Sequence, residues 1–463
     1  MKEILRQFQA ESEEKAFDPE HRRKIHFNIG RYNEAVDRGL KAFSNHERAR
    51  DRASYIKQHA ILNLDKYLLE FEQNFIRNGG KVIWARNAEE ALQEIWKIFE
   101  AKNARSVVKS KTMTTEEIHL NEFLEKHGVD VVETDLGEYI VQLAGQKPYH
   151  IVTPAMHMSK KDISELFADK LGIPRTDDAT ELTLTARRLL RQRYTTADIG
   201  ITGGNFLIAD VGGIALTENE GNARLSTTFP RTHIAVVGIE KLIPSINDLG
   251  LMWQMLATSG TGQHVTVYNS VITGPRKANE TDGPEEMYVV LLDNGRSDLL
   301  ADEEKRAALK CIRCGACLNT CPVYKNIGGH TYKTTYSGPI GSIISPQYLG
   351  MEKYKHLSYA SSLCGSCTTV CPVRIPIHEL LLLNRKQSVR DGLNDKMEKF
   401  GFGVWQKAML NRSLMNMASY RIKNAVISVL FRKTWSKRRE VIKVAPKSFN
   451  QMWKEREENR KDI

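Results

Sequence analysis

Cys311-Ile-Arg-Cys314-Gly-Ala-Cys317-Leu-Asn-Thr-Cys321-Pro322 is the stretch from which the organisation of this chain is best worked out. It follows C-x₂-C-x₂-C-x₃-C-P, a spacing in which three thiolates of one tight loop hold one iron-sulfur cube and the fourth crosses to a neighbouring cube. A second run, Ser361-Ser-Leu-Cys364-Gly-Ser-Cys367-Thr-Thr-Val-Cys371-Pro372, repeats the pattern with a serine in first place. All seven cysteines of the 463-residue chain lie in these two runs. Together the runs predict a two-cluster domain of the ferredoxin type.

The crossing rule assigns ligands to both clusters. The first, a [4Fe-4S] cluster, has four thiolates: Cys311, Cys314, Cys317 and Cys371. The second has only three: Cys321, Cys364 and Cys367. Ser361 stands where the fourth cysteine belongs, so three interpretations stay open. The second site holds a [3Fe-4S] core, or a [4Fe-4S] cube whose fourth iron takes Ser361, water or a partner's group, or a labile cluster.

Zinc and disulfides are the alternative uses of these cysteines. Zinc ribbons use paired C-x₂-C units rather than three evenly spaced thiols followed by C-P. Disulfides are disfavoured because the cysteines are odd in number and the chain is long enough to bury its own core. The opening Met1-Lys-Glu-Ile-Leu-Arg6 also carries charges where a secretory signal has none. With 41% hydrophobic and 27% charged residues and no apolar stretch near the ~20 residues that cross a bilayer, we expect a soluble cytoplasmic protein.

The basic charge of the chain is concentrated in its C-terminal part. Residues 381–463 contain 20 Lys and Arg against 8 Asp and Glu, while the whole chain carries +11. Apolar patches bracketed by basic residues, Trp405–Leu410 and Ala425–Trp435, lie in this tail. Basic amphipathic helices bind anionic membrane surfaces or acidic partners, although a solvated helix face is the simpler interpretation. We expect a docking surface for a redox partner or the inner membrane face. No nucleic-acid-binding motif accompanies the charge.

The part of the chain before the cysteines is expected to be helical at first and then α/β. Residues 55–71 show apolar positions at a period near 3.6, which predicts a helix, and Gly79-Gly80 ends the helical segment. Short β-rich runs then alternate with helices, with strands at 81–85, 106–109 and 129–133. Strand, helix, strand in this order means parallel crossovers, hence an open α/β sheet.

A glycine-rich region of this sheet is the candidate ligand site. Gly203 and Gly204 form a turn whose free N–H groups could cradle an anion, although glycine often serves only backbone geometry there. Glu218 and Arg224 follow the apolar strand 214–216, and ligands of open α/β sheets sit at the carboxyl ends of strands. A solvated turn closed by an Arg-carboxylate pair is the competing interpretation. The G-x-G-x-x-G spacing of a dinucleotide site is absent.

The segment Ala197–Pro244, with Ile-Thr-Gly-Gly-Asn-Phe and Thr-Glu-Asn-Glu-Gly-Asn-Ala-Arg, followed by the two cysteine runs, resembles the lactate-utilization iron-sulfur protein B family. The resemblance covers nearly the whole chain. It implies a lactate-utilization domain related in fold to sugar-phosphate isomerases and CoA transferases, and membership of a three-protein system that oxidises L-lactate to pyruvate in the bacterial cytoplasm. A serine in place of the first cysteine of the second run, here Ser361, also resembles the pattern of that family. Glu218-Asn219 is followed by Glu220 where a CoA transferase has glycine, so that family's nucleophile role does not transfer.

The expected function follows from electron counting. Lactate oxidation releases two electrons and an iron-sulfur cluster passes one at a time, so with no flavin or nicotinamide motif we expect an electron-transfer subunit that works with the other subunits of the system and an unidentified acceptor. The alternative is an α/β domain that itself binds or converts an organic acid or acyl-CoA at Gly203, Gly204, Glu218 and Arg224, with the clusters as redox sensors. A nucleic-acid-binding regulator is a third, weaker class.

Four segments are expected along the chain: a helical N-terminal segment (1–78), the lactate-utilization α/β domain (79–298), the dicluster domain (299–384) and a basic helical extension (385–463). The insertion between the cysteine runs is rich in glycine and tyrosine. It is expected to cover the clusters or shape a partner contact, and its His330 is expected to be a hydrogen-bonded loop residue rather than an iron ligand.

Overall fold

A six-stranded parallel sheet is the centre of the α/β part. The computed structural model describes residues 2–431 and 440–461, and the strand order in this sheet is β1-β10-β7-β4-β2-β3. The strands are β1 (Lys81–Ala85), β2 (Ser106–Lys109), β3 (Asp130–Glu133), β4 (Ile199–Thr202), β7 (Thr232–Gly238) and β10 (Glu286–Leu292). Val107 of β2 pairs with Ile199 of β4, and Gly200 pairs with His233 of β7. The three strands predicted from the sequence are present.

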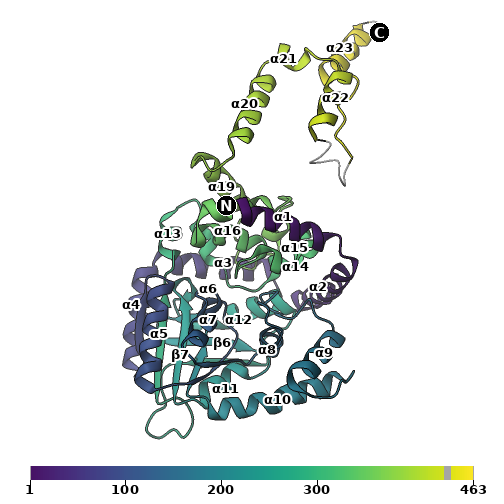
Figure 1. The fold of residues 1–463 in the computed structure, drawn as a ribbon. Helices are drawn as coiled ribbons and strands as arrows, with labels where there is room; N and C mark the ends of the chain where they lie inside the picture. The colour runs from purple at the N-terminus through teal and green to yellow at the C-terminus, as the bar shows by residue number, and fades with distance from the viewer. Residues whose placement is uncertain (1, 432–439, 462–463) are drawn as a thin grey trace. The chain divides into compact units, whose positions relative to one another are not determined.

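Both faces of this sheet are covered by helices, as in other all-parallel sheets. Every residue of β7 is buried. Ile234 and Val236 pack into a cluster with α5 and α7 on one face, while Ala235 and Val237 pack into a cluster with α4 on the other. Figure 1 shows these helices flanking the strands. The connecting helices are α5 (Ala88–Lys102), α6 (Met113–Glu117), α7 (Leu120–Lys126), α8 (Leu136–Leu143), α9 (Lys160–Leu171), α10 (Ala179–Thr196), α11 (Asn222–Thr228) and α12 (Ile246–Thr261).

A second, mixed sheet holds the strand that ends at Glu218. Its order is β8-β5-β6-β9, formed by β5 (Phe206–Ile208), β6 (Gly213–Glu218), β8 (Leu242–Ile243) and β9 (Tyr268–Ile272). β6 runs antiparallel to both of its neighbours. The expectation that strand 214–216 ends at the carboxyl edge of the parallel sheet is therefore wrong, because the strand belongs to a different sheet.

Four helices precede the sheet: α1 (Lys2–Ala16), α2 (Pro19–Leu40), α3 (His46–Leu62) and α4 (Leu64–Arg77). The helix predicted over residues 55–71 is interrupted at Asn63, whose φ of −126° and ψ of 36° are not helical. The Asn63 side-chain amide donates to the His59 carbonyl, 2.8 Å away, and so satisfies one of the carbonyls at the end of α3. The apolar period alone does not reveal this break, since it continues through Asn63.

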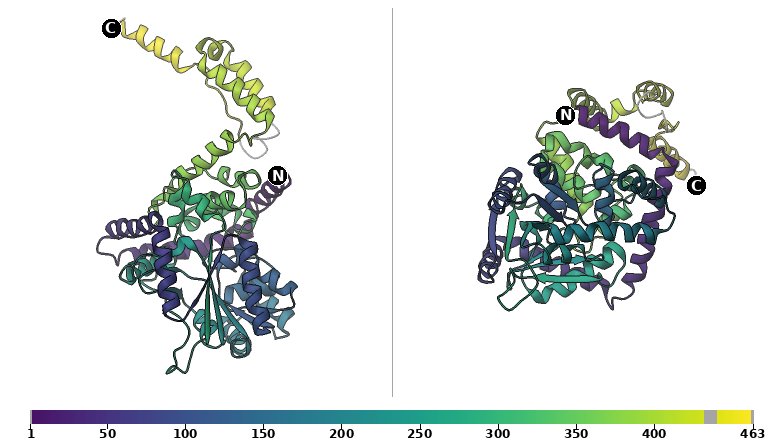
Figure 2. Two further views of the ribbon diagram at one scale, coloured as in Figure 1. Left: turned by 90° about the vertical axis from the view of Figure 1, so that its left-hand side faces the viewer. Right: turned by 60° about the horizontal axis from the view of Figure 1, so that its bottom comes forward.

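The cysteine-bearing part is a set of short helices beside the parallel sheet. They are α13 (Arg296–Ala301), α14 (Ala316–Thr320), α15 (Pro322–Ile327), α16 (Gly338–Leu349), α17 (Met351–Tyr359), α18 (Ser366–Thr369) and α19 (Ile377–Arg390), with 3₁₀ turns η2 (Arg306–Lys310) and η3 (His330–Tyr332). A further 3₁₀ turn, η1 (Ile239–Lys241), follows β7 in the α/β part. The left view of Figure 2 shows the strands fanned out to one side of these helices.

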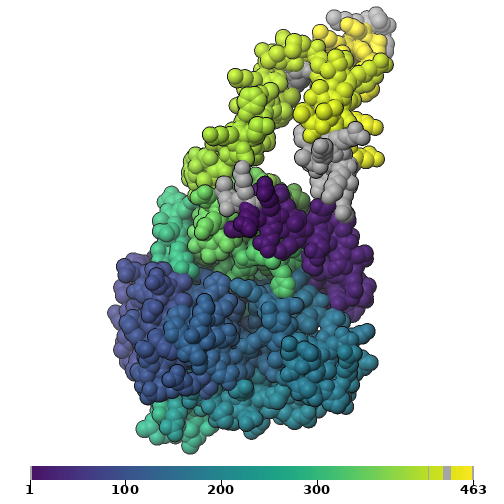
Figure 3. All heavy atoms as spheres, viewed as in Figure 1, coloured from purple at the N-terminus to yellow at the C-terminus, as the bar shows by residue number. Residues whose placement is uncertain are grey.

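The N-terminal helices pack directly on this cysteine-bearing part. α1 contacts α15 and η3, and α2 contacts α14 and α15. Ile25, Ile29 and Ile56 share one apolar core with Cys314, Cys317 and Cys371. Figure 3 shows the purple N-terminal residues lying against the green ones. The N-terminal segment thus contributes to the walls around the cysteines.

The described residues from Asp391 onward, 391–431 and 440–461, form a separate compact unit. Its helices are α20 (Lys396–Leu410), α21 (Arg412–Asn416), α22 (Tyr420–Phe431) and α23 (Phe449–Lys461). Large apolar side chains are exposed on them, among them Phe400, Trp405 and Val429. Of the patch Ala425–Trp435, residues 432–435 lie outside the described part of the chain. No helix among the described residues is both long and apolar enough to cross a bilayer. The α/β open sheet and the flanking helical parts confirm the predicted fold class.

Candidate metal centres

Four cysteines surround one apolar cavity. Cys311, Cys314, Cys317 and Cys371 line it together with apolar side chains, including Ile312, Ile340 and Val373. Burial is the main cause that raises the pKa of the Cys314 and Cys317 thiols well above the ordinary value, and charge on the neighbouring cysteines adds to it. Coordination to a metal deprotonates such a thiol.

The donor set of this cavity fits an iron-sulfur cube. A cube presents an iron at each of several corners and takes one thiolate at each, so its ligands stand around a space. No three His, Cys, Asp or Glu side chains of residues 2–431 and 440–461 converge on one point, as the ligands of a single ion do. The cavity instead offers thiols around a shared apolar volume, which residues of both cysteine runs enclose.

The other three cysteines lie together in a more open place. Cys321 and Cys367 are buried, whereas Cys364 is exposed. Burial, followed by the charge of Cys321, raises the pKa of Cys367 to about 11. Thr320 and Ser366, each adjacent to a cysteine of this group, have their hydroxyl oxygens 2.5 Å apart. The second group is therefore held by contacts between the two runs but is less well shielded from solvent.

The two runs repeat the same backbone geometry. Each has two residues with positive φ around the cysteine at its second ligand position, Cys314 or Cys364: Arg313 (62°) and Gly315 (83°) in the first run, Leu363 (54°) and Gly365 (79°) in the second. A short helix, α14 or α18, follows each glycine. Only the glycines adopt such backbone angles without strain, which explains why glycine follows the cysteine at the second ligand position in both runs.

Ser361 occupies the same local position as Cys311. The backbone N–H of Arg313 donates to Cys311 Sγ at 3.4 Å, and the backbone N–H of Leu363 donates to Ser361 Oγ at 3.1 Å. In both cases the donor lies two residues after the acceptor. The serine hydroxyl therefore stands where a first thiolate would stand in the second run.

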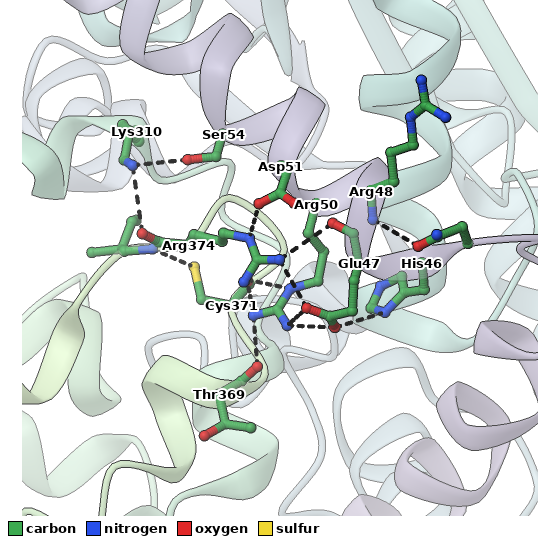
Figure 4. A network of polar contacts seen from close by, with 12 residues as sticks. His46, Glu47, Arg48, Arg50, Asp51, Ser54, Lys310, Thr369, Cys371 and Arg374 are labelled. Carbon is green, nitrogen blue, oxygen red and sulfur yellow. Dashed lines mark hydrogen bonds and ion pairs between the residues drawn. The ribbon is translucent and has the colours of Figure 1, made fainter.

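Helix α3 holds the end of the second run in place (Figure 4). The Arg50 guanidinium donates to the Cys371 carbonyl from Nη2 at 2.9 Å and to the Thr369 carbonyl at 2.7 Å. Its Nη1 donates to Glu47 at 2.9 Å, and Glu47 also accepts from Arg374 at 2.8 Å. The buried arginine thereby fixes the backbone that carries Cys371. Sequence reasoning missed Arg50, because nothing in the local pattern of α3 links it to cysteines more than 300 residues away.

A buried ionic network adjoins the first cysteine group on the side of the sheet. Arg313 stacks on Tyr336, 4.2 Å from the ring centre, and pairs with Glu240 at 3.4 Å. Glu240 and Glu117 share Arg296, whose guanidinium is fully buried. Burial alone would raise the pKa of Glu240, but the charges of Arg296 and Arg313 lower it to about 2.

Three members of this network lie in the segments that follow parallel strands. Glu117, Glu240 and Arg296 come after β2, β7 and β10, on the side of the carboxyl edge where open α/β sheets place their sites. The sequence analysis did not select them, because the spacing of these residues along the chain does not show that they meet.

The four residues predicted as a ligand site have structural partners. A side chain at Gly203 would strike Thr112, and one at Gly204 would crowd Val237 and Ile214. Glu218 accepts from the backbone N–H groups of Ala223 and Arg224 at 2.6 and 3.0 Å, at the start of α11.

The Arg224 guanidinium lies over the Tyr268 ring. None of the four predicted residues lines the cysteine cavity. Their ligand role stays a prediction. His330 lies in the insertion and donates from Nε2 to the Lys147 carbonyl of a distant segment, 2.7 Å away.

Comparison with known proteins agrees with this architecture. The model of the LUD domain matches residues 68–292, and that of the 4Fe-4S dicluster domain matches residues 307–375. "Lactate utilization protein B" of Anoxybacillus flavithermus is 48% identical over 365 residues, covering 78% of this chain and 77% of the relative. The chain belongs to the lactate utilization protein B family. It is an iron-sulfur protein of the 4Fe-4S dicluster type.

Two further relatives and one solved structure complete the comparison. "Lactate utilization protein B" of Bacillus subtilis is 46% identical over 380 residues, covering 81% of this chain and 78% of the relative. "Uncharacterized electron transport protein YkgF" of Escherichia coli is 46% identical over 374 residues, covering 79% and 78%. A DUF162 family protein from Deinococcus radiodurans is 15% identical, with a TM-score of 0.29 over 50% of this chain and 98% of that one.

Proposed function

We propose that this chain is the iron-sulfur electron-transfer subunit of a complex that oxidises L-lactate to pyruvate. The observation that carries the proposal is the presence of two cysteine groups in one module, one around an apolar cavity with mostly buried thiols and one with an exposed cysteine, Cys364. Two clusters at such sites would let single electrons enter at one and leave at the other. The lactate substrate comes from the printed names of the relatives, and the electron-transfer role is supported by the name of the Escherichia coli relative.

The proposed ligands are those that the crossing pattern gives. Cys311, Cys314, Cys317 and Cys371 hold a [4Fe-4S] cluster, and the other three cysteines hold a second cluster as [4Fe-4S] or [3Fe-4S]. Ser361 is the proposed fourth ligand of the second cluster, since its hydroxyl repeats the position of Cys311. Arg50 donates to the Thr369 and Cys371 carbonyls of the second cysteine run and so holds the backbone near the first cluster.

The proposed partners are the other subunits of the lactate-utilization system, which would carry the site of lactate oxidation. The exposed apolar and basic side chains of α20 and α22 support a peripheral contact of the tail with a partner or with the inner face of the membrane. No nucleic-acid partner is proposed.

Anaerobic turnover tests the proposal. The purified chain alone, given L-lactate and an artificial electron acceptor, should form no pyruvate, and its clusters should stay oxidised. Adding the partner subunits should reduce the clusters upon addition of L-lactate. Pyruvate formation by the chain alone would contradict a pure relay and would favour the alternative, in which the α/β domain is itself the catalyst at Gly203, Gly204, Glu218 and Arg224.

A further inference from the structure

The buried ionic network beside the first cysteine group includes two lysines besides its arginines. Lys57 of α3 is 1% exposed, and its ammonium donates to the backbone carbonyls of Glu240 at 2.6 Å and Leu242 at 3.0 Å. Lys241, in the turn η1, is 8% exposed. Within residues 2–431 and 440–461, neither ammonium forms an ion pair with a carboxylate. Both lysines therefore bring positive charge into the interior.

The network holds more cations than carboxylates. Its cations are Lys57, Lys241, Arg296 and Arg313, and its carboxylates are Glu117 and Glu240. Burial opposes the ionisation of Glu117, but the charge of Arg296 outweighs burial and lowers the pKa of this carboxyl. Glu240 is also ionised, with its pKa at about 2. Four cations against two ionised carboxylates leave an excess of two positive charges among buried side chains.

An excess of buried charge requires a countercharge close by. Burial lowers the pKa of Lys57 to about 7 and that of Lys241 to about 8, although negative charge at Cys311 opposes both shifts. Arg313, whose side chain is 9% exposed, lines the cavity of the first cysteine group, and its Nη1 is buried without a hydrogen-bond partner among the described residues. The sulfur atoms of a cluster accept hydrogen bonds, and a cube held by four thiolates is an anion. The cavity beside the network can therefore hold the countercharge.

The surroundings of the second cysteine group differ. Burial raises the pKa of Cys321, and Lys325 is a cation that opposes this shift. Lys325 is only partly buried, and Cys364 of the same group is exposed. Water and dissolved ions screen charges at such places. The second group is therefore in contact with solvent, whereas the first lies next to buried cations.

We propose that the excess positive charge of this network compensates the negative charge of the first cluster and raises its reduction potential. Burial in an apolar cavity disfavours the negative charge that reduction adds, and cations in a low-dielectric interior counteract this strongly. Lys57 and Lys241 act through their charge and are not ligands. The proposal rests on the proposed ligand set and electron relay, and it deepens them by naming the residues that make an enclosed cluster reducible.

Redox titration of the anaerobically prepared holoprotein, followed by EPR, tests the role of Lys241. In Lys241→Met the midpoint potential of the first cluster should fall by at least about 59 mV, which is a tenfold change in the ratio of reduced to oxidised cluster. The same ratio for the second cluster should change by less than about threefold, because solvent screens that site. The signal of the first cluster is the one that Cys314→Ser lacks. An unchanged potential of the first cluster, or an equal fall in both potentials, would overturn the proposal.

Matched substitutions separate charge from packing. Lys241→Arg keeps the charge and should hold the ratio of reduced to oxidised first cluster within about threefold of that in the unaltered protein. Lys57→Met should shift the potential in the same direction as Lys241→Met. Lys97→Met, which alters an exposed lysine on α5, is the control and should leave both potentials unchanged. A shift in Lys241→Arg or in Lys97→Met as large as that in Lys241→Met would contradict the proposal.

Iron content decides the case in which a variant does not assemble. If Lys241→Met loses the first cluster and Lys241→Arg retains it at an unaltered potential, the lost charge is the cause and the proposal stands. Loss in both would show a packing role and refute it. Failure of the relay is a different result, in which the partner subunits do not reduce the clusters although the potentials shift as stated. Failure of the ligand assignment would appear as a Cys314→Ser protein with its full iron content.

Discussion

The two cysteine groups share one backbone pattern and differ in how completely they are enclosed. In the first group four thiols surround an apolar cavity, the Arg50 guanidinium donates to the Cys371 carbonyl, and the backbone N–H of Arg313 donates to Cys311 Sγ. The second group has three thiols and the Ser361 hydroxyl, and its Cys364 is exposed. Exposure and hydrogen bonding to sulfur set the potential and reactivity of a cluster. The same loop therefore serves a site whose thiols are mostly buried, here called the sealed site, and a site with an exposed thiol, here called the open site. We expect the open site to exchange electrons with a partner.

Cys314→Ser should have the largest effect, because it removes a ligand from the sealed site. The expected result is loss of about one [4Fe-4S] cluster's worth of iron per chain, with the signal of the second cluster retained. Iron analysis and EPR of anaerobically isolated protein measure this. A fall in iron much smaller than one cluster would show that Cys314 does not hold the first cluster.

Removal of iron by a chelator under air should affect the open site first. Cys364 is exposed, whereas Cys314, Cys317 and Cys371 are buried, so oxidant and chelator reach the second cluster sooner. We expect two phases of bleaching, and the fast one should carry the EPR signal of the second cluster. Loss of both clusters at one rate would remove the distinction between the sites.

Arg50→Ala should weaken the sealed site through its backbone. Three hydrogen bonds from the guanidinium to carbonyls of the second run would be lost, at a cost of about 3 kcal/mol in the free energy of unfolding. The midpoint of thermal unfolding and the iron content should both fall.

The matched control for Arg50 is Arg48→Ala on the same helix, because Arg48 is exposed. It should change the free energy of unfolding by less than about 0.5 kcal/mol. Equal effects of the two substitutions would mean that Arg50 does not support the Cys371 loop.

Ser361→Cys should have the smallest effect on stability. It tests most directly whether the serine accounts for the difference between the two cysteine groups. The new thiol would take the position that the Leu363 N–H already marks, which would convert the second site to four thiolates. We expect a changed EPR spectrum of the second cluster and slower bleaching in air. An unchanged spectrum would show that residue 361 does not face the cluster.

Local chemistry is the part of this molecule that the sequence predicts well. The cysteine spacing predicts both groups, and the alternation of strand and helix predicts the parallel sheet, because each depends on residues close together in the chain. The positive φ angles at Gly315 and Gly365 likewise depend on residues close together in the chain.

Contacts between residues far apart in the chain could not be predicted from the sequence. Arg50 and Arg296 act through partners more than 100 residues away, and no spacing rule reports such contacts. The assignment of strand 214–216 to the parallel sheet failed for the same reason, because its pairing with β5 and β9 depends on tertiary structure.

Iron and acid-labile sulfide, measured in protein isolated without oxygen and combined with EPR before and after dithionite, test the central claim most directly. We predict about seven to eight iron atoms per chain and two distinguishable cluster signals. Colourless protein that carries zinc in place of iron would contradict the account.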